Sequence, residues 1–134
     1  MSPLRWLTGL KWLLLANVAA SILHYTDNVL FFGEYPEPTW INPSIVDAFW
    51  FVMTPLAWLG YRQVRRGATL TGSLVLLGYG VANLLSLGHY RYAPMHAISH
   101  RINAFILLEA ALAIMLIAYL AMPRRRTADA VEAK

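Results

Sequence analysis

The sequence predicts an all-α membrane protein, a bundle of four transmembrane helices with both termini in the cytoplasm. Composition, the length of the apolar segments and the distribution of basic residues all favour this fold. Of the 134 residues, 58% are hydrophobic and 13% are charged, whereas soluble domains are usually about 45–50% apolar and about 25% charged. A soluble chain this short would struggle to bury so much apolar surface, so we expect lipid to cover it.

Four apolar segments have the length of membrane-spanning helices. They cover residues 11–32, 44–61, 68–90 and 97–122, each close to the roughly 20 residues that cross about 30 Å of hydrocarbon. Turns rich in Gly and Pro separate them, and they lack the strict alternation of membrane strands. Residues 1–20 also resemble a cleaved signal peptide, but the apolar character resumes at 29–32, as a span requires. We therefore expect a transmembrane domain over residues 1–123 and a short charged cytoplasmic tail over 124–134.

The basic residues indicate how the helices cross the membrane. Only Arg91 and Arg101 fall on one side of the predicted spans, and the other nine of the 11 Lys and Arg residues fall on the opposite side. Because basic residues remain inside, both termini are expected in the cytoplasm, and the chain in the bacterial inner (plasma) membrane. The net charge of +4 does not indicate nucleic-acid binding, since the basic residues cluster between apolar segments. The absence of cysteine excludes disulfides and thiolate metal sites.

A short pattern occurs twice. Ser-x-x-His-Tyr ends the first apolar segment at residues 21–25 and the third at 86–90. Asp-Ala-Phe at 47–49 and Asn-Ala-Phe at 103–105 open the second and fourth. The pattern is compatible with a 2+2 hairpin repeat, although matches this short also arise by chance. In a true repeat, His24 and His89 would be equivalent and would face a shared centre.

The histidines and two acids gather near the outer ends of the predicted helices. They are His24, His89, His96, His100, Asp27 and Asp47. Ionisable side chains in lipid cost several kcal/mol unless they are paired or hydrated, so each needs a structural or functional reason. On the first helix, a stripe at helical spacing adds further polar groups to this cluster: Asn17, Ser21, His24 and Asn28.

One hypothesis for this cluster is a metal site. The spacing His96-x-x-x-His100 would place two imidazoles one helical turn apart, which suits a Zn, Cu or Fe ion. His24 and His89 could complete the ligand set, with Asp27 or Asp47 as a ligand or as a partner of a ligand. In a second interpretation these groups only anchor and cap the helices, with Asp27 or Asp47 paired to Arg91 or Arg101. Metal-free acid–base chemistry by His–Asp pairs is a third.

Glu109 is the most unusual single residue. It lies about 13 Å along the fourth helix from His100, by the rise of about 1.5 Å per residue, and therefore near mid-membrane. Because it is half a turn out of phase with His100, it should face a neighbouring helix, a partner or a cavity. It is expected to be either a functional acid or a protonated carboxyl bonded to Asn83 or Thr54.

Two other features concern packing and access. Small residues along the third span should allow close approach of a neighbouring helix: Gly72, Gly78, Gly80, Ala82 and Gly88. The loop over residues 33–42 could cover the polar cluster as a stiff lid or simply connect two helices.

Motifs typical of nucleotide binding, zinc proteases and serine hydrolases are missing. The plan of four helices, acids near their outer ends and a proline-rich loop after the first resembles in outline the EXPERA group of sterol isomerases and sterol-binding proteins. No motif of that group matches residue by residue. The resemblance implies a pocket for a sterol or isoprenoid.

Three functions follow as expectations. The first is a transition-metal site, for chemistry on a lipid-like substrate or for metal handling. The second is a metal-free sterol or isoprenoid pocket, with Glu109 and Asp27 as acid–base groups. The third is a non-catalytic subunit, as a homo-oligomer or in a larger membrane complex. Asp47 is a further catalytic candidate. The expected partners are the bilayer and a lipid-like small molecule, and no nucleic acid.

Overall fold

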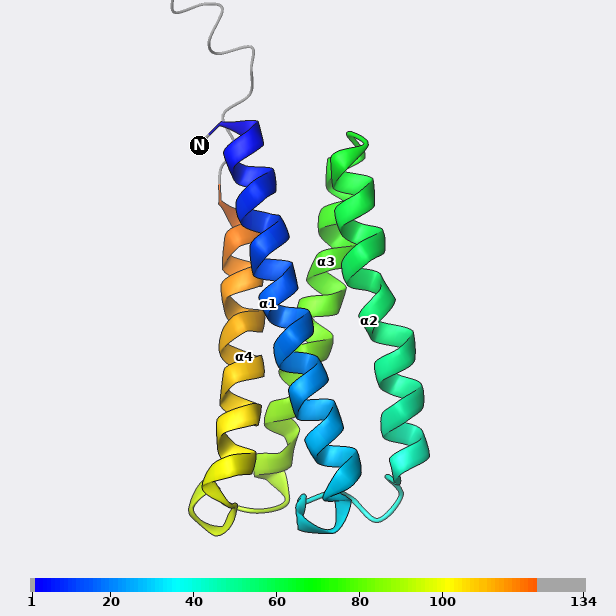
Figure 1. Ribbon diagram of the computed structural model, residues 1–134, viewed down its shortest axis with the longest axis vertical. Coiled ribbons are helices and arrows are strands. Elements are labelled where there is room, and N and C mark those ends of the chain that lie inside the picture. The colour runs from blue at the N-terminus through cyan, green and yellow to red at the C-terminus, as the bar shows by residue number, and fades with distance from the viewer. Residues whose placement is uncertain (1, 123–134) are drawn as a thin grey trace, which may run out of the picture.

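The computed structural model describes residues 2–122, so the predicted tail over 124–134 lies outside the described residues. Four α-helices dominate it, α1 (Pro3–Leu30), α2 (Pro43–Arg65), α3 (Thr69–Leu84) and α4 (His100–Ala121) (Figure 1). Three short 3-10 helices complete it, η1 (Phe32–Glu34), η2 (Leu85–Arg91) and η3 (Met95–Ala97). No strand occurs within residues 2–122. The prediction of an all-helical chain is confirmed.

Three of the helical segments are long and apolar enough to cross a membrane. They are α1, the continuous run of α3 and η2 over Thr69–Arg91, and α4. α2 has 23 residues but does not belong to this group. Asp47, Pro55 and two tryptophans lower its mean hydropathy, although tryptophan is common at membrane interfaces. The structure therefore supports a membrane protein with three candidate spans among its four α-helices.

Polar caps and prolines determine where the helices begin. The Ser2, Asn42 and Ser99 side chains each accept a hydrogen bond from the backbone N–H three residues later. Pro3 and Pro43 stand at the first helical positions, where a missing N–H costs nothing. Because Ser99 caps α4, that helix starts at His100, three residues later than predicted.

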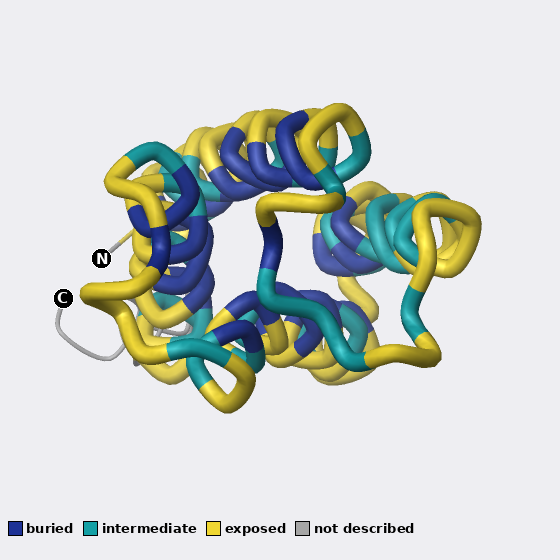
Figure 2. The backbone as a smooth tube through the Cα atoms, turned by 90° about the horizontal axis from the view of Figure 1, so that it is seen from below, coloured by how far each residue is buried: buried dark blue, intermediate teal, exposed yellow. Residues whose placement is uncertain are grey.

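The helices form a closed ring in the order α1–α2–α3–α4, each packed on its two neighbours (Figure 2). One end of the ring carries the connections over residues 31–42 and 92–99, together with all four histidines, and we call it the histidine end. The main apolar core fills the rest of the bundle and includes Trp6, Leu10, Leu76, Tyr79 and Leu116. A smaller apolar cluster at the histidine end packs Tyr35 of the first connection against Ile98, Ile102 and Ile106.

Two glycines let α2 and α3 approach closely. A Cβ at Gly60 would lie 2.6 Å from Leu76 Cγ, and one at Gly72 would lie 2.7 Å from the Gly60 carbonyl oxygen. The predicted packing role of small residues is therefore supported at Gly72. Gly78 and Gly88 differ, because a Cβ on either would meet no other described residue within 4 Å, the adjoining backbone of its own helix aside.

Candidate functional site

A half-open cavity of about 480 Å³ lies at the histidine end of the bundle. Its two sides differ in chemistry. The α2 side is apolar and aromatic, formed by Ile45, Val46, Phe49, Trp50 and Met53. The opposite side is polar and combines residues of α1, α3, η2 and α4, namely Ser21, His24, Asn28, Asn83, Ser86, His89 and Glu109. An apolar wall facing a few convergent polar groups is typical of small-molecule sites.

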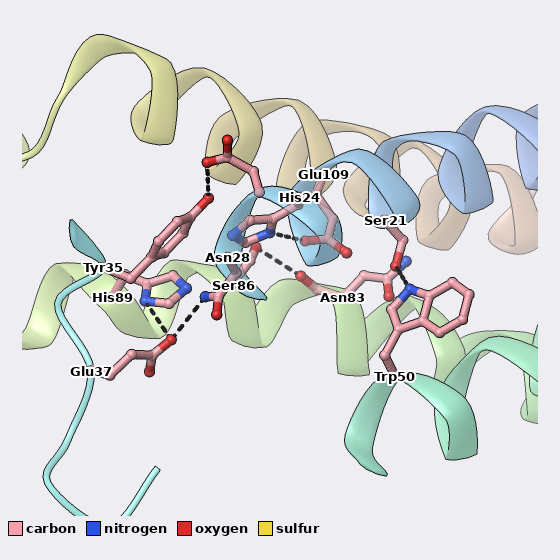
Figure 3. Close-up of polar contacts among 11 residues, drawn as sticks. Ser21, His24, Asn28, Tyr35, Glu37, Trp50, Asn83, Ser86, His89 and Glu109 are labelled. Atoms are coloured by element: carbon pink, nitrogen blue, oxygen red, sulfur yellow. Dashed lines mark hydrogen bonds and ion pairs between the residues drawn. The ribbon is translucent and has the colours of Figure 1, made fainter. Parts of the chain in front are cut away.

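A histidine–glutamate pair lies on the polar wall. His24 Nδ1 of α1 is 2.5 Å from Glu109 Oε2 of α4, and the two side chains are only 8% and 9% exposed (Figure 3). The other ring nitrogen, His24 Nε2, is buried and has no hydrogen-bond partner within residues 2–122. Glu109 faces a neighbouring helix and a cavity, as predicted, and its partner is His24 rather than Asn83 or Thr54.

A second histidine–glutamate pair lies next to the first. His89 Nδ1 of η2 is 3.5 Å from Glu37 Oε1 and 3.4 Å from the Pro36 carbonyl oxygen. Asn28 Nδ2 also donates to Glu37 Oε1, at 3.0 Å. The His24 and His89 rings meet edge to face, with centroids 5.6 Å apart. The two histidines of the repeated pattern therefore do face a shared centre.

The first connection crosses the end of the bundle and covers this centre (Figure 2). The Tyr35 ring lies against both imidazoles, at centroid distances of 5.7 Å from His24 and 5.3 Å from His89. Tyr35 Oη donates to Asp27 Oδ2 at 2.8 Å. Burial first, and the hydrogen bond to Asp27 second, raise the pKa of Tyr35, so its hydroxyl remains a donor.

Asp27 is tied to this loop rather than to the cavity. Arg101 contacts Asp27 through one guanidinium nitrogen, and its other nitrogen donates to Glu34 Oε2 at 2.6 Å. The sequence had left open an Asp27–Arg101 pair, and the structure contains it. With Tyr35, these groups form a clasp that joins α1, the loop and α4; the cavity lining among the described residues does not include Asp27.

Asp47 supports the aromatic wall. It accepts a hydrogen bond from Tyr25 Oη at 2.5 Å, and the Tyr25 ring stacks on Trp50 with centroids 4.8 Å apart. Trp50 Nε1 in turn donates to Ser21 Oγ at 3.1 Å. Among the described lining residues Asp47 is also absent, so the geometry assigns it a positioning role.

The repeated pattern has a structural counterpart beyond the histidines. Tyr25 Oη binds Asp47, and Tyr90 Oη donates to Asn103 Oδ1 at 2.9 Å. Each tyrosine closes a Ser-x-x-His-Tyr pattern, and each acceptor opens an Asp/Asn-Ala-Phe pattern. The two hairpins thus make the same contact.

The predicted set of four histidines does not come together. His96 lies in η3 and His100 is the first residue of α4, so the two do not share a helical turn, and both are exposed. Over residues 2–122, no three or more His, Cys, Asp and Glu side chains are grouped so that they could hold one metal ion. The structure brings His24, His89 and Glu109 together and leaves His96 and His100 apart.

Sequence reasoning did not assign Glu37 and Tyr35 to the site, although both belong to the loop that it expected either to cover the polar cluster or simply to connect two helices. Glu37 and Tyr35 belong to an irregular loop, where no periodicity indicates a direction. The stripe on α1 was informative, because Asn17, Ser21, His24 and Asn28 are all buried.

Comparison of the chain with protein-family models, with curated proteins and with solved structures finds no match. Any function must therefore be argued from the site itself.

Proposed function

We propose that this chain is a membrane protein whose cavity binds a lipid-like molecule, of sterol or isoprenoid type, and transfers a proton to or from it. The observation that carries the proposal is the buried His24–Glu109 pair on the wall of an otherwise largely apolar cavity. A volume of about 480 Å³ falls within the roughly 300–1,000 Å³ typical of ligand pockets.

In this proposal His24 and Glu109 have different roles. Among the described residues His24 Nε2 has no hydrogen-bond partner, so it is the group that would give a proton to, or take one from, a carbon atom of the ligand. Glu109 binds the other ring nitrogen, Nδ1. This contact orients the imidazole, and the Glu109 carboxylate accepts or returns the proton. A pair of side chains positioned in this way is typical of general acid–base catalysis. Asp27, held by Arg101 and Tyr35, anchors the loop instead of reacting.

The membrane topology is part of the same proposal. With 23 residues, α2 is about 35 Å long at about 1.5 Å per residue, enough to serve as a fourth span of about 30 Å. The distribution of basic residues supports cytoplasmic termini, a histidine end outside and a bacterial inner membrane. The equivalent Tyr25–Asp47 and Tyr90–Asn103 contacts support a 2+2 hairpin repeat.

Native mass spectrometry of protein purified in mild detergent tests the proposed binding. Wild-type protein should carry a lipid adduct. Met53→Trp should lose most of it, because Met53 lines the cavity and the larger ring would fill that space. Met115→Trp is the matched control, since Met115 is an exposed methionine of α4. Absence of any adduct from native membranes, or equal adducts in both variants, would contradict the proposal.

A metal site in the cavity has less geometric support. Two imidazoles and two carboxylates lie near one another, but no three such side chains within residues 2–122 are grouped around one point, whereas a typical catalytic zinc site has three protein ligands. Elemental analysis of untagged protein, beside His24→Gln and His96→Gln variants, tests the metal hypothesis directly. Near-stoichiometric Zn, Cu or Fe that disappears only with His24 would overturn the metal-free proposal.

A further inference from the structure

We infer that Glu37 and His89 form a proton path that connects the outer surface of the loop with the His24–Glu109 pair. This inference rests on the proposed function, because it concerns how that pair would be recharged. It assigns a role in proton transfer to two residues that the acid–base pair itself does not require.

The need for a path follows from burial. His24 and Glu109 are 8% and 9% exposed, and the wall opposite them is apolar. Hydrocarbon supplies no protons, so a buried acid that donates one must regain it from water through the protein. Glu37 is the most accessible of the four groups, with a side chain that is 15% exposed in the loop across the end of the bundle.

The four groups follow one another in space and come from four different elements. Glu37 lies in the first connection, His89 in η2, His24 in α1 and Glu109 in α4. Glu37 Oε1 is 3.5 Å from His89 Nδ1, the two rings are 5.6 Å apart between centroids, and His24 Nδ1 is 2.5 Å from Glu109 Oε2. Figure 3 shows the series, with Tyr35 beside both rings.

One gap in the series is suited to a water molecule. No direct hydrogen bond joins the two imidazoles among the contacts of the described residues. His24 Nε2 and Asn28 Oδ1 are both buried without a hydrogen-bond partner in the part of the chain that the structure describes, and both residues line the cavity with His89. A buried water needs two to four polar partners, and these groups offer them.

Transfer along this path conserves protons at every step. Glu37 passes a proton to His89 Nδ1, and His89 releases one from its other ring nitrogen to the water. The water passes a proton to His24 Nε2, and His24 releases one from Nδ1 to Glu109 Oε2. One proton moves inward and both rings change tautomer. Before the next transfer the starting tautomers must be restored, either by rotation of each ring or by the same transfers in reverse.

Neighbouring ionisable groups are poor alternatives to this path. Asp27 is paired with Arg101 and bonded by Tyr35. The Tyr35 hydroxyl keeps its proton because burial raises its pKa. Both groups therefore hold the loop over the path without carrying protons themselves.

NMR of protein labelled with ¹⁵N-histidine, in lipid nanodiscs without added ligand, measures the path directly. The readout is the rate at which the His24 imidazole proton exchanges with water. In Glu37→Gln that rate should fall on the order of a hundredfold, the lower end of what a positioned acid–base group contributes. The amide can still accept the hydrogen bond from Asn28, so the loop should keep its place.

His96→Gln is the matched control and should leave His24 exchange unchanged, since His96 is exposed and is not among the described residues that line the cavity. His89→Gln should slow exchange as Glu37→Gln does. Unchanged exchange in both path variants would overturn the inference. Native mass spectrometry on the same samples separates this failure from that of the proposed function. If the protein carries a lipid adduct and the path variants exchange at the wild-type rate, only the path is refuted. If the protein carries no adduct and the path variants exchange slowly, only lipid binding is refuted.

Discussion

His24 and Glu109 illustrate how two polar side chains are retained inside an apolar bundle. Each would be costly alone, because a buried donor or acceptor without a partner loses its hydration and regains nothing. Together they satisfy each other across α1 and α4 at 2.5 Å. The same contact stabilises the bundle and leaves His24 Nε2 in the cavity, without a hydrogen-bond partner among the described residues.

Truncation of Glu109 should therefore destabilise the protein more than a conservative change does. We expect Glu109→Ala to lower the free energy of unfolding by about 1–3 kcal/mol, the usual cost of leaving a buried polar group unsatisfied. Glu109→Gln should cost less, because an amide can still hydrogen-bond His24 Nδ1. Thermal unfolding in detergent measures both. Equal stability of the alanine variant and the wild type would show that the pair is not formed.

The connection over residues 31–42 depends on contacts from outside itself. Its own 3-10 turn, η1, is short, and Arg101 of α4 holds it through Glu34 while Tyr35 bonds Asp27 of α1. This clasp explains how an irregular segment rich in Gly and Pro can stay across the cavity. The sequence left the lid and the plain connection as alternatives, because no local pattern indicates where a loop folds back.

Loss of the clasp should loosen the loop without unfolding the helices. In Arg101→Gln, amide hydrogen exchange over residues 33–42 should accelerate, because Asp27 and Glu34 lose their common partner. Arg91→Gln serves as the control, since Arg91 is an exposed arginine at the same end. If exchange in the loop is the same in both variants, Arg101 does not hold it.

The contact between α2 and α3 predicts a contrast between two glycines. Gly72→Ala should destabilise by about 1–3 kcal/mol, as overpacking does, because its Cβ would lie 2.7 Å from the backbone of Gly60 and Val64. Gly78→Ala has room and should be neutral or stabilise by up to about 1 kcal/mol through helix propensity. Denaturation of both variants in detergent tests this, and a reversed order would contradict the observed helix packing.

Across the molecule, hydrophobic pattern and turn residues predicted the number and approximate extent of the helices. They were wrong about the start of α4, because the Ser99 cap makes His100 the first residue of that helix. His96 therefore lies outside α4 and does not share a helical turn with His100. Periodicity on α1 identified its polar face, but it could not show that Glu109 would meet His24. Such convergence depends on the relative rotation of helices, which side-chain packing determines.

The predicted orientation can be tested cleanly because the chain has no cysteine. Thr39→Cys in the loop at the histidine end should react with a membrane-impermeant thiol reagent in intact cells. Ala68→Cys, between α2 and α3, should react only after the cells are lysed. Both positions are exposed. The opposite labelling pattern would invert the topology, and labelling of both on intact cells would contradict a crossing by α2.

Deuterium transfer is the measurement that tests the central claim most directly. Purified protein carrying its lipid is incubated in D₂O, returned to H₂O, and the extracted lipid is analysed by mass spectrometry. Acid–base chemistry by His24 and Glu109 predicts deuterium on carbon that survives the return, and its loss in Glu109→Gln. Lipid that remains bound but acquires no deuterium, or acquires it equally in Glu109→Gln, would contradict proton transfer by this pair.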